Sequence, residues 1–163
     1  MIKTLTMAGG LAGAVTLSQF PEFSQQYMQR MAGAVDELRG VVVAFDLTAS
    51  ASGLTRQEAL GRMQGDDFQE GLRDTIKGSI TRYEQLSTNL DALRGATPLD
   101  RLKQAYRFTD SDIARRTWQD FKPAVPVTTD GFITAGIGFL AGWLGLGVLF
   151  GGLRRAGRRL IAA

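Results

Sequence analysis

The sequence predicts an all-α membrane protein, in which two terminal transmembrane helices flank an antiparallel helical bundle. Three observations indicate this fold: an uncharged stretch near each end of the chain, apolar residues at helical spacing between them, and no convincing strand-like alternation. A length of 163 residues suits one small domain with membrane anchors.

The uncharged stretch near the C-terminus is the stronger membrane signal. Residues 131–153 form a run of 23 without a charge, preceded by Asp130 and followed by Arg154. As a helix this run would measure about 34 Å at ~1.5 Å per residue, which is enough to cross the hydrocarbon core of a bilayer. We therefore expect a transmembrane helix over residues 131–153.

The N-terminal stretch, residues 4–21, is shorter and more polar. Its 18 uncharged residues lie close to the lower limit for spanning, which is roughly 17 residues. A cleaved signal peptide is the alternative, with residues 12–14 (Ala-Gly-Ala) as the cleavage site. That alternative leaves only residues 5–11 as the apolar region, which is too short. An uncleaved membrane helix is therefore favoured for residues 4–21.

The charges are distributed unevenly along the chain. Residues 21–130 carry all 16 acids and 14 of the 19 bases, whereas residues 131–163 carry four arginines and no acid. Basic residues beside a span favour the cytoplasmic side, so Lys3 and the arginine tail place both termini in the cytoplasm. The predicted order is then an extracytoplasmic helical domain (22–122), periplasmic in a Gram-negative host, a connector (123–130), the second span and a basic tail (154–163).

The tail arginines also predict contact with anionic lipid headgroups, because they follow directly after a span. These residues are Arg154, Arg155, Arg158 and Arg159. Because the high isoelectric point comes from this tail, a basic nucleic-acid-binding face on the folded domain is not indicated. We expect no nucleic-acid partner.

Glycines recur four residues apart in both predicted spans, a spacing that lets helices approach closely in lipid. The alternative is that glycine is simply common in membrane helices. The predicted packing residues are Gly9, Gly13, Gly138, Gly142, Gly147 and Gly151. We expect these spans to pack on each other or on helices of a partner.

The first helix of the central domain follows Pro21, a residue expected to bend the chain where it leaves the membrane. Its apolar residues alternate at spacings of four and three. They are Tyr27, Met31, Ala34, Leu38, Val41 and Phe45. Tyr27, Met31, Leu38 and Phe45 are the candidates for a self-association or partner-association seam. Because the repeat covers fewer than three heptads, antiparallel packing within the domain is an equally good interpretation.

Local signals mark the remaining helices. Thr55 to Glu58 reads as a capping box, and Asp66 with Asp67 begins a long helix that ends at Arg94. Its predicted apolar stripe is Phe68, Leu72, Ile76, Ile80, Tyr83, Leu86, Leu90 and Leu93. A short helix is expected from Pro98, with Leu99, Leu102 and Tyr106 inward. The last helix of the domain begins at Asp110 or Ser111, with Ile113, Trp118 and Phe121 on one side.

The composition excludes many kinds of chemistry. With no cysteine and no histidine, the chain has no thiolate or imidazole nucleophile or metal ligand and no disulfide. The one dense acidic group is Asp66, Asp67, Glu70 and Asp74, and solvated acids at a helix N-terminus explain it better than catalysis does. We predict no catalytic residue, no metal site and no cofactor, and hence a protein that is not an enzyme.

Two regions resemble a known family. Residues 9–13 (Gly-Gly-Leu-Ala-Gly) and 17–30, which begin Leu-Ser-Gln-Phe-Pro-Glu-Phe, resemble the start of an uncharacterised proteobacterial family of membrane proteins, catalogued as domain of unknown function 2937. Residues 121–126 (Phe-Lys-Pro-Ala-Val-Pro), followed by a glycine-rich span, are similar too. The resemblance extends over essentially the whole chain and implies an inner-membrane protein with two spans. It implies no activity.

These observations favour a non-catalytic accessory or structural subunit of a larger inner-membrane complex, with a respiratory or photosynthetic electron-transfer assembly as an example. The expected partners are membrane lipids and other integral membrane subunits. The alternative is a free-standing, periplasm-facing binding or sensing module, which would form a homo-oligomer through the seam.

Overall fold

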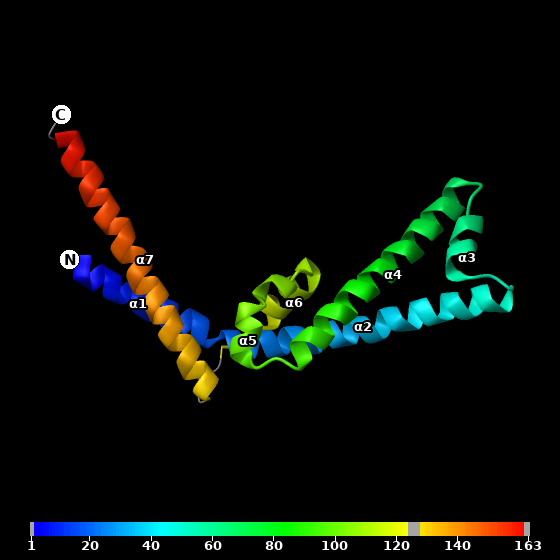
Figure 1. The fold of residues 1–163 in the computed structure, drawn as a ribbon, viewed down its shortest axis with the longest axis horizontal. Coiled ribbons are helices and arrows are strands. Elements are labelled where there is room, and N and C mark those ends of the chain that lie inside the picture. Colours follow the sequence, from blue (N-terminus) through cyan, green and yellow to red (C-terminus); the bar gives the residue numbers. More distant parts are fainter. Residues whose placement is uncertain (1, 124–127, 162–163) are drawn as a thin grey trace. The chain divides into compact units, whose positions relative to one another are not determined.

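The computed structural model describes residues 2–123 and 128–161, with the side chains of all of these except residues 2, 154 and 156–161. Its described residues form helices joined by short loops, with no strand among them (Figure 1). The predicted all-α class is confirmed. The helices are α1 (Ile2–Ser18), α2 (Phe20–Ala51), α3 (Arg56–Arg62), α4 (Asp67–Arg94), α5 (Pro98–Lys103), the 3-10 turn η1 (Ala105–Arg107), α6 (Ser111–Asp120) and α7 (Thr129–Ile161).

The chain divides into two compact units. Unit 1 comprises residues 1–25, 97–103 and 120–163, and unit 2 comprises residues 26–96 and 104–119. Helix α2 is continuous through the boundary, since its first turns belong to unit 1 and the rest to unit 2. Helix α5 contacts α7 and belongs to unit 1, so residues of the predicted central domain, 22–122, contribute to both units.

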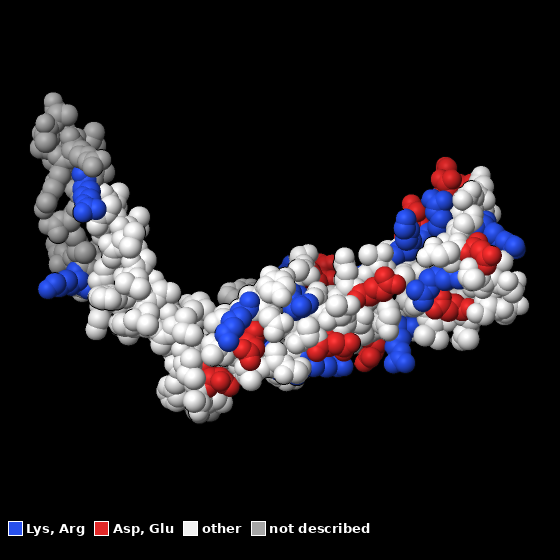
Figure 2. All heavy atoms as spheres, in the orientation of Figure 1, with Lys and Arg blue, Asp and Glu red and all other residues white. Residues whose placement is uncertain are grey.

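Unit 1 is built on an antiparallel pair of helices, α1 and α7. Gly13 lies against Gly138, and Thr6 lies beside Gly147, so the two helices run in opposite directions. On the face seen in Figure 2, this pair is almost entirely uncharged along its length. By length and composition, one helix among the described residues qualifies as a membrane span, over Thr129–Leu153. Helix α1 has 17 residues.

The chain breaks between α1 and α2 at a different place from the one predicted. Helix α1 ends at Ser18, α2 begins at Phe20, and Gln19 between them is a turn. Pro21 is therefore inside the first turn of α2, where its missing N–H would have no helical partner in any case. The expected bend exists, but it lies before the proline, and the first helix stops short of residue 21.

Unit 2 has one apolar core. It is formed where α2, α4 and α6 meet, and its buried members are Tyr27, Met28, Met31, Leu86, Leu90, Leu93 and Ile113. The rings of Tyr27 and Phe108 pack with centroids 4.7 Å apart. Burying these side chains stabilises the antiparallel arrangement of α2 and α4, at about 1.5–3 kcal/mol for each large residue. The first half of the predicted seam is thus the interior of this unit.

Several predicted inward residues lie elsewhere. Val41 is exposed and Val42 is buried instead, because the spacing of the buried positions on α2 shifts after Leu38. On α6 the buried partner of Ile113 is Thr117, one turn away, whereas Trp118 is 71% exposed. Tyr106, in η1, is exposed as well. A helix of 3.6 residues per turn brings positions four apart onto one face, and Trp118 is five from Ile113.

The helix ends follow their local signals. The Oγ1 atom of Thr55 accepts a hydrogen bond from the Glu58 N–H, and Glu58 reaches back to the Thr55 N–H at 2.8 Å. Asp66 caps α4 by accepting from the Gln69 N–H at 2.8 Å. Helix α7 is capped by Thr128, which accepts from the Gly131 N–H, so this cap lies outside the predicted span. Residues 124–127 of the predicted connector lie outside the described residues.

Candidate functional site

An apolar hollow on unit 2 lies where α2, α3 and α4 surround a common space, and we call it the tip groove. Its volume is about 350 Å³. Its lining residues are Phe45, Thr48, Ala49, Ser52, Leu54, Ala59, Met63, Leu72 and Ile76. The lining comes from the end of α2, from Ala59 of α3, from the start of α4 and from the loops between these helices, so three helices contribute to a single apolar surface.

Helix α3 is held in this place by its first residue. The Arg56 guanidinium binds Asp46 of α2 through two hydrogen bonds, with 2.7 Å between Arg56 Nε and Asp46 Oδ1. Its Nη1 atom also lies 3.6 Å from Glu84 of α4. The hydrogen bond from Arg56 lowers the pKa of the Asp46 carboxyl. Arg56 therefore links α2, α3 and α4.

The apolar stripe of α4 continues past the core into the tip groove and remains uncovered there. Leu72 is 42% exposed, and Phe68, one turn nearer the helix start, is 77% exposed. The sequence predicts both as inward residues. They remain exposed because α2 and α4 diverge toward α3 in unit 2 (Figure 1). Exposed apolar side chains of this size beside a groove are typical of surfaces that bind another molecule.

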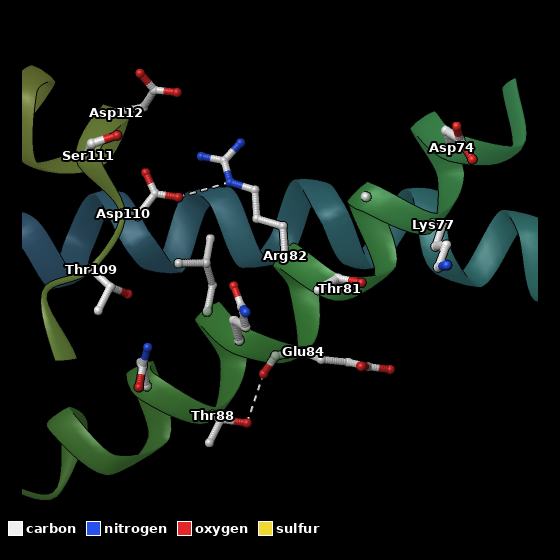
Figure 3. A pocket seen from close by; sticks show the side chains of 14 residues that line it. Asp74, Lys77, Thr81, Arg82, Glu84, Thr88, Thr109, Asp110, Ser111 and Asp112 are labelled. Carbon is white, nitrogen blue, oxygen red and sulfur yellow. Dashed lines mark hydrogen bonds and ion pairs between the residues drawn. The ribbon is translucent and has the colours of Figure 1, made fainter. Parts of the chain in front are cut away.

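A second hollow on unit 2 is polar. It runs along α4 to the start of α6, and Figure 3 shows the side chains that line it. Arg82 of α4 reaches across to Asp110, with its Nε donating to Asp110 Oδ2 at 3.0 Å. Asp110 also caps α6, since its Oδ1 accepts from the Ile113 N–H at 2.9 Å, and its own N–H donates to the Tyr27 hydroxyl at 3.2 Å. Asp110 thus connects α2, α4 and α6.

The electrostatics of this network follow from these contacts. Burial alone would raise the pKa of Asp110, but the hydrogen bonds from Ile113 and Arg82 outweigh it and hold that pKa below its ordinary value. Burial raises the pKa of the Tyr27 hydroxyl, so that hydroxyl stays neutral at physiological pH. The ionised form of Asp110 is the form that the fold stabilises.

The pKa of Asp110 predicts a pH-dependent contribution to stability. Because its folded-state pKa is lowered, this contribution is fully present above the unfolded pKa, about 3.9, and disappears as the pH falls through the folded pKa. We expect Asp110→Asn to lower the thermal midpoint of unit 2 at pH 7 and to have progressively less effect below about pH 4. Thermal unfolding of both proteins across this range measures the difference. A difference in thermal midpoint that persists unchanged at the lowest pH would contradict the inference that ionised Asp110 stabilises the fold.

Four of the six predicted packing glycines meet the partner helix within unit 1. A Cβ atom on Gly13 would overlap the Gly138 carbonyl oxygen, and one on Gly142 would overlap that of Gly9. A Cβ on Gly147 would lie 4.0 Å from Thr6, whereas one on Gly151 would meet no described atom within 4 Å. The backbones of α1 and α7 therefore touch at Gly9, Gly13, Gly138 and Gly142.

The other predicted site residues have diverse positions. Tyr27 and Met31 are completely buried within unit 2, Leu38 packs at the edge of the core, and Phe45 lines the tip groove. Of the tail arginines, Arg155 is exposed, and the side chains of Arg154, Arg158 and Arg159 lie outside the described set. The seam residues are therefore divided between the interior and the tip groove.

Sequence reasoning did not pair Arg82 with Asp110, because 28 residues separate them. The capping signal at Asp110 was readable, but it carries no information about a partner on α4. Among the described residues, no three acidic side chains converge in the manner of a metal site.

Comparison with known proteins gives one match. Residues 1–159 match the sequence model of the DUF2937 family, which is described as a protein of unknown function. No curated protein and no solved structure matches the chain.

Proposed function

The chain belongs to the DUF2937 family, whose description assigns no function, and from the residues themselves we propose that it is a non-catalytic accessory or structural subunit of a larger inner-membrane complex. Respiratory and photosynthetic electron-transfer assemblies are the first complexes to examine. The observation that carries this proposal is the tip groove, which is lined by the exposed Leu72, together with the exposed Phe68 one turn away on α4. A large apolar surface outside the uncharged helix pair is best explained by a protein that covers it.

The proposal includes two membrane spans. The outer faces of α1 and α7 carry exposed apolar side chains, among them Leu5, Leu11, Val15, Leu140, Leu144 and Val148. Helix α1 is about 26 Å long at ~1.5 Å per residue, close to the ~30 Å hydrocarbon core. Since α1 and α7 are antiparallel, both termini would lie on one side. Lys3 and the basic tail favour the cytoplasm, which places unit 2 in the periplasm.

Leu72→Asp tests the partner surface. We expect it to reduce recovery of partner subunits at least about tenfold, because a carboxylate would be buried in an apolar contact. Quantitative mass spectrometry of proteins that co-purify from native membranes in a mild detergent measures the recovery. Leu47→Asp is the matched control, since Leu47 is 66% exposed on α2 and does not line the tip groove. Equal recovery with both variants would exclude the tip groove as the contact.

The second candidate is a free-standing, periplasm-facing binding or sensing module. The polar groove along α4 favours it, because that groove offers charged groups on a rigid helical support. It predicts that the detergent-extracted protein is recovered alone or only with copies of itself. A stoichiometric set of other membrane subunits would instead support the accessory role.

A further inference from the structure

Helix α7 has three faces, of which one packs on α1 and two point outward. At 3.6 residues per turn, successive residues lie about 100° apart around the helix axis. The face on α1 contains Gly138 and Gly142. One outward face is aliphatic, and its residues are Ile133, Ile137, Leu140, Leu144 and Val148. The other face carries all the aromatic residues of α7, which are Phe132, Phe139, Trp143 and Phe150.

The aromatic residues form one straight stripe along α7. They occur at spacings of seven, four and seven residues, which keeps them within about 40° of one another around the helix axis. From Phe132 to Phe150 the stripe is about 27 Å long at ~1.5 Å per residue, close to the thickness of the hydrocarbon core. Gly136 lies beside this aromatic stripe, and a Cβ atom there would meet no described atom within 4 Å. A neighbour that crosses the membrane therefore has room to lie along the whole aromatic stripe.

Trp143 lies at an unusual depth for a tryptophan. The candidate span is Thr129–Leu153, so Trp143 is near its midpoint, whereas tryptophans of membrane helices gather at the two interfaces with water. Its side chain is 44% exposed, and its indole N–H donates to no described residue. The centre of a bilayer has no water to accept this hydrogen bond, and lipid chains have no acceptor. Trp143 therefore favours a neighbour that supplies one.

Neither this chain nor a second copy of it offers a side-chain acceptor at that depth. Because Gly9 lies against Gly142 in the antiparallel pair, Trp143 is level with the middle of α1. Residues 7–13 of α1, and residues 138–142 and 144–147 of α7, are all apolar or glycine. Two copies with the same orientation in the membrane would bring these same residues to the same depth. The neighbour that Trp143 favours is therefore a different protein.

We propose that the aromatic stripe of α7 packs against a transmembrane helix of a partner subunit, and that this helix carries a hydroxyl or carboxamide side chain near its midpoint. The oxygen of that side chain accepts a hydrogen bond from the Trp143 indole N–H, as polar side chains do between other membrane helices. The aliphatic face of α7 faces lipid chains, which it resembles. This inference rests on the proposed accessory role and on α7 spanning the membrane, and it names a contact that the partner makes inside the bilayer.

Photo-cross-linking in native membranes identifies the neighbour. Trp143→p-benzoylphenylalanine should cross-link to an apolar segment of another membrane protein. Mass spectrometry of the cross-linked peptide should place serine, threonine, asparagine or glutamine near the middle of that segment. The matched control is Leu144→p-benzoylphenylalanine, because Leu144 is 55% exposed on the aliphatic face at nearly the same depth. We expect at least about fivefold less cross-linking to protein from the control, since it faces lipid.

The hydrogen bond has a test of its own. Trp143→Phe keeps an aromatic ring and removes the N–H. We therefore expect co-purification of the cross-linked partner in a mild detergent to fall about threefold, which is the effect of an average hydrogen bond between membrane helices. Trp143→Ala also removes the ring and should reduce it at least about tenfold. Trp118→Phe is the matched control, because it makes the same change on α6.

Cross-linking from position 143 to lipid alone, to a second copy of this chain or to a small apolar molecule such as a quinone overturns the inference. Equal recovery of the partner with Trp143→Phe and Trp118→Phe also overturns it. The accessory role is tested separately, through Leu72 on unit 2. That role therefore survives each of these results if Leu72→Asp still reduces the recovery of partner subunits.

Discussion

Replacing Gly138 with leucine is expected to separate α1 from α7. A Cβ atom at this position would overlap the carbonyl oxygen of Gly13, and it would lie 2.7 Å from the Gly13 carbonyl carbon and 2.8 Å from the Leu17 Cβ. Backbone atoms cannot rotate out of the way as a side chain can, so the whole of α1 must move. We expect a loss of about 3 kcal/mol in the association of the two helices.

The measurement uses the absence of cysteine from the chain. Thr6 and Gly147 face each other across the helix pair, so the double variant Thr6→Cys, Gly147→Cys should form a disulfide under mild oxidation. Adding Gly138→Leu should abolish most of the cross-link. Gly136→Leu is the control, because a Cβ there meets no described atom within 4 Å. Efficient cross-linking in the Gly138→Leu protein would show that the glycine contact does not hold the pair together.

The contact between α1 and α7 was predictable in part from the spacing of glycines. The sequence contains three pairs of glycines four residues apart. Gly9 with Gly13 and Gly138 with Gly142 form the contact between α1 and α7, whereas Gly147 with Gly151 lies at its edge. Gly147 lies opposite Thr6, so the next glycine on that spacing, Gly151, falls near the level where α1 begins at Ile2. The pattern describes one helix, whereas the extent of contact depends on the length and direction of its neighbour.

Helix ends were predictable because their causes are local. Thr55 and Asp66 cap helices through residues three positions away, and no tertiary contact is needed to recognise them. The buried face of α2 was predictable only as far as Leu38, because the continuous valines of residues 41–43 left the inward position undetermined. In the structure the buried residue of the three is Val42.

The three hollows of unit 2 were not predictable from the sequence. The tip groove exists because α2 and α4 separate beyond their shared core, and this depends on the arrangement of three helices that the ion pairs of Arg56 connect. The hollow lined by Arg30, Arg82 and Arg116 depends on residues from α2, α4 and α6 that are distant in the chain. The spacing of apolar residues indicates that each helix has an apolar stripe. It does not indicate where the apolar stripe of the neighbouring helix ends.

Truncating Tyr27 to alanine is expected to cause the largest loss of stability in unit 2. Its side chain is 0% exposed, packs against Phe108 and accepts a hydrogen bond from the Asp110 N–H, so Tyr27→Ala removes a core ring and leaves a buried donor without its acceptor. We expect a loss of about 4–5 kcal/mol, of which Tyr27→Phe should reproduce only about 1 kcal/mol. Domain stabilities are typically about 5–15 kcal/mol, so this is a large part of the total.

Amide hydrogen exchange in the full chain measures this loss where it should occur, at the buried α4 residues Leu86, Leu90 and Leu93. Tyr106→Ala is the control, since Tyr106 is exposed. The same experiment separates two roles for the seam. If Tyr27 belonged to an interface between copies, protection at α4 would depend on protein concentration and Tyr27→Ala would act only on the oligomer. Because Tyr27 and Met31 are enclosed by their own chain, we expect protection that is independent of concentration and is lost in Tyr27→Ala at every concentration.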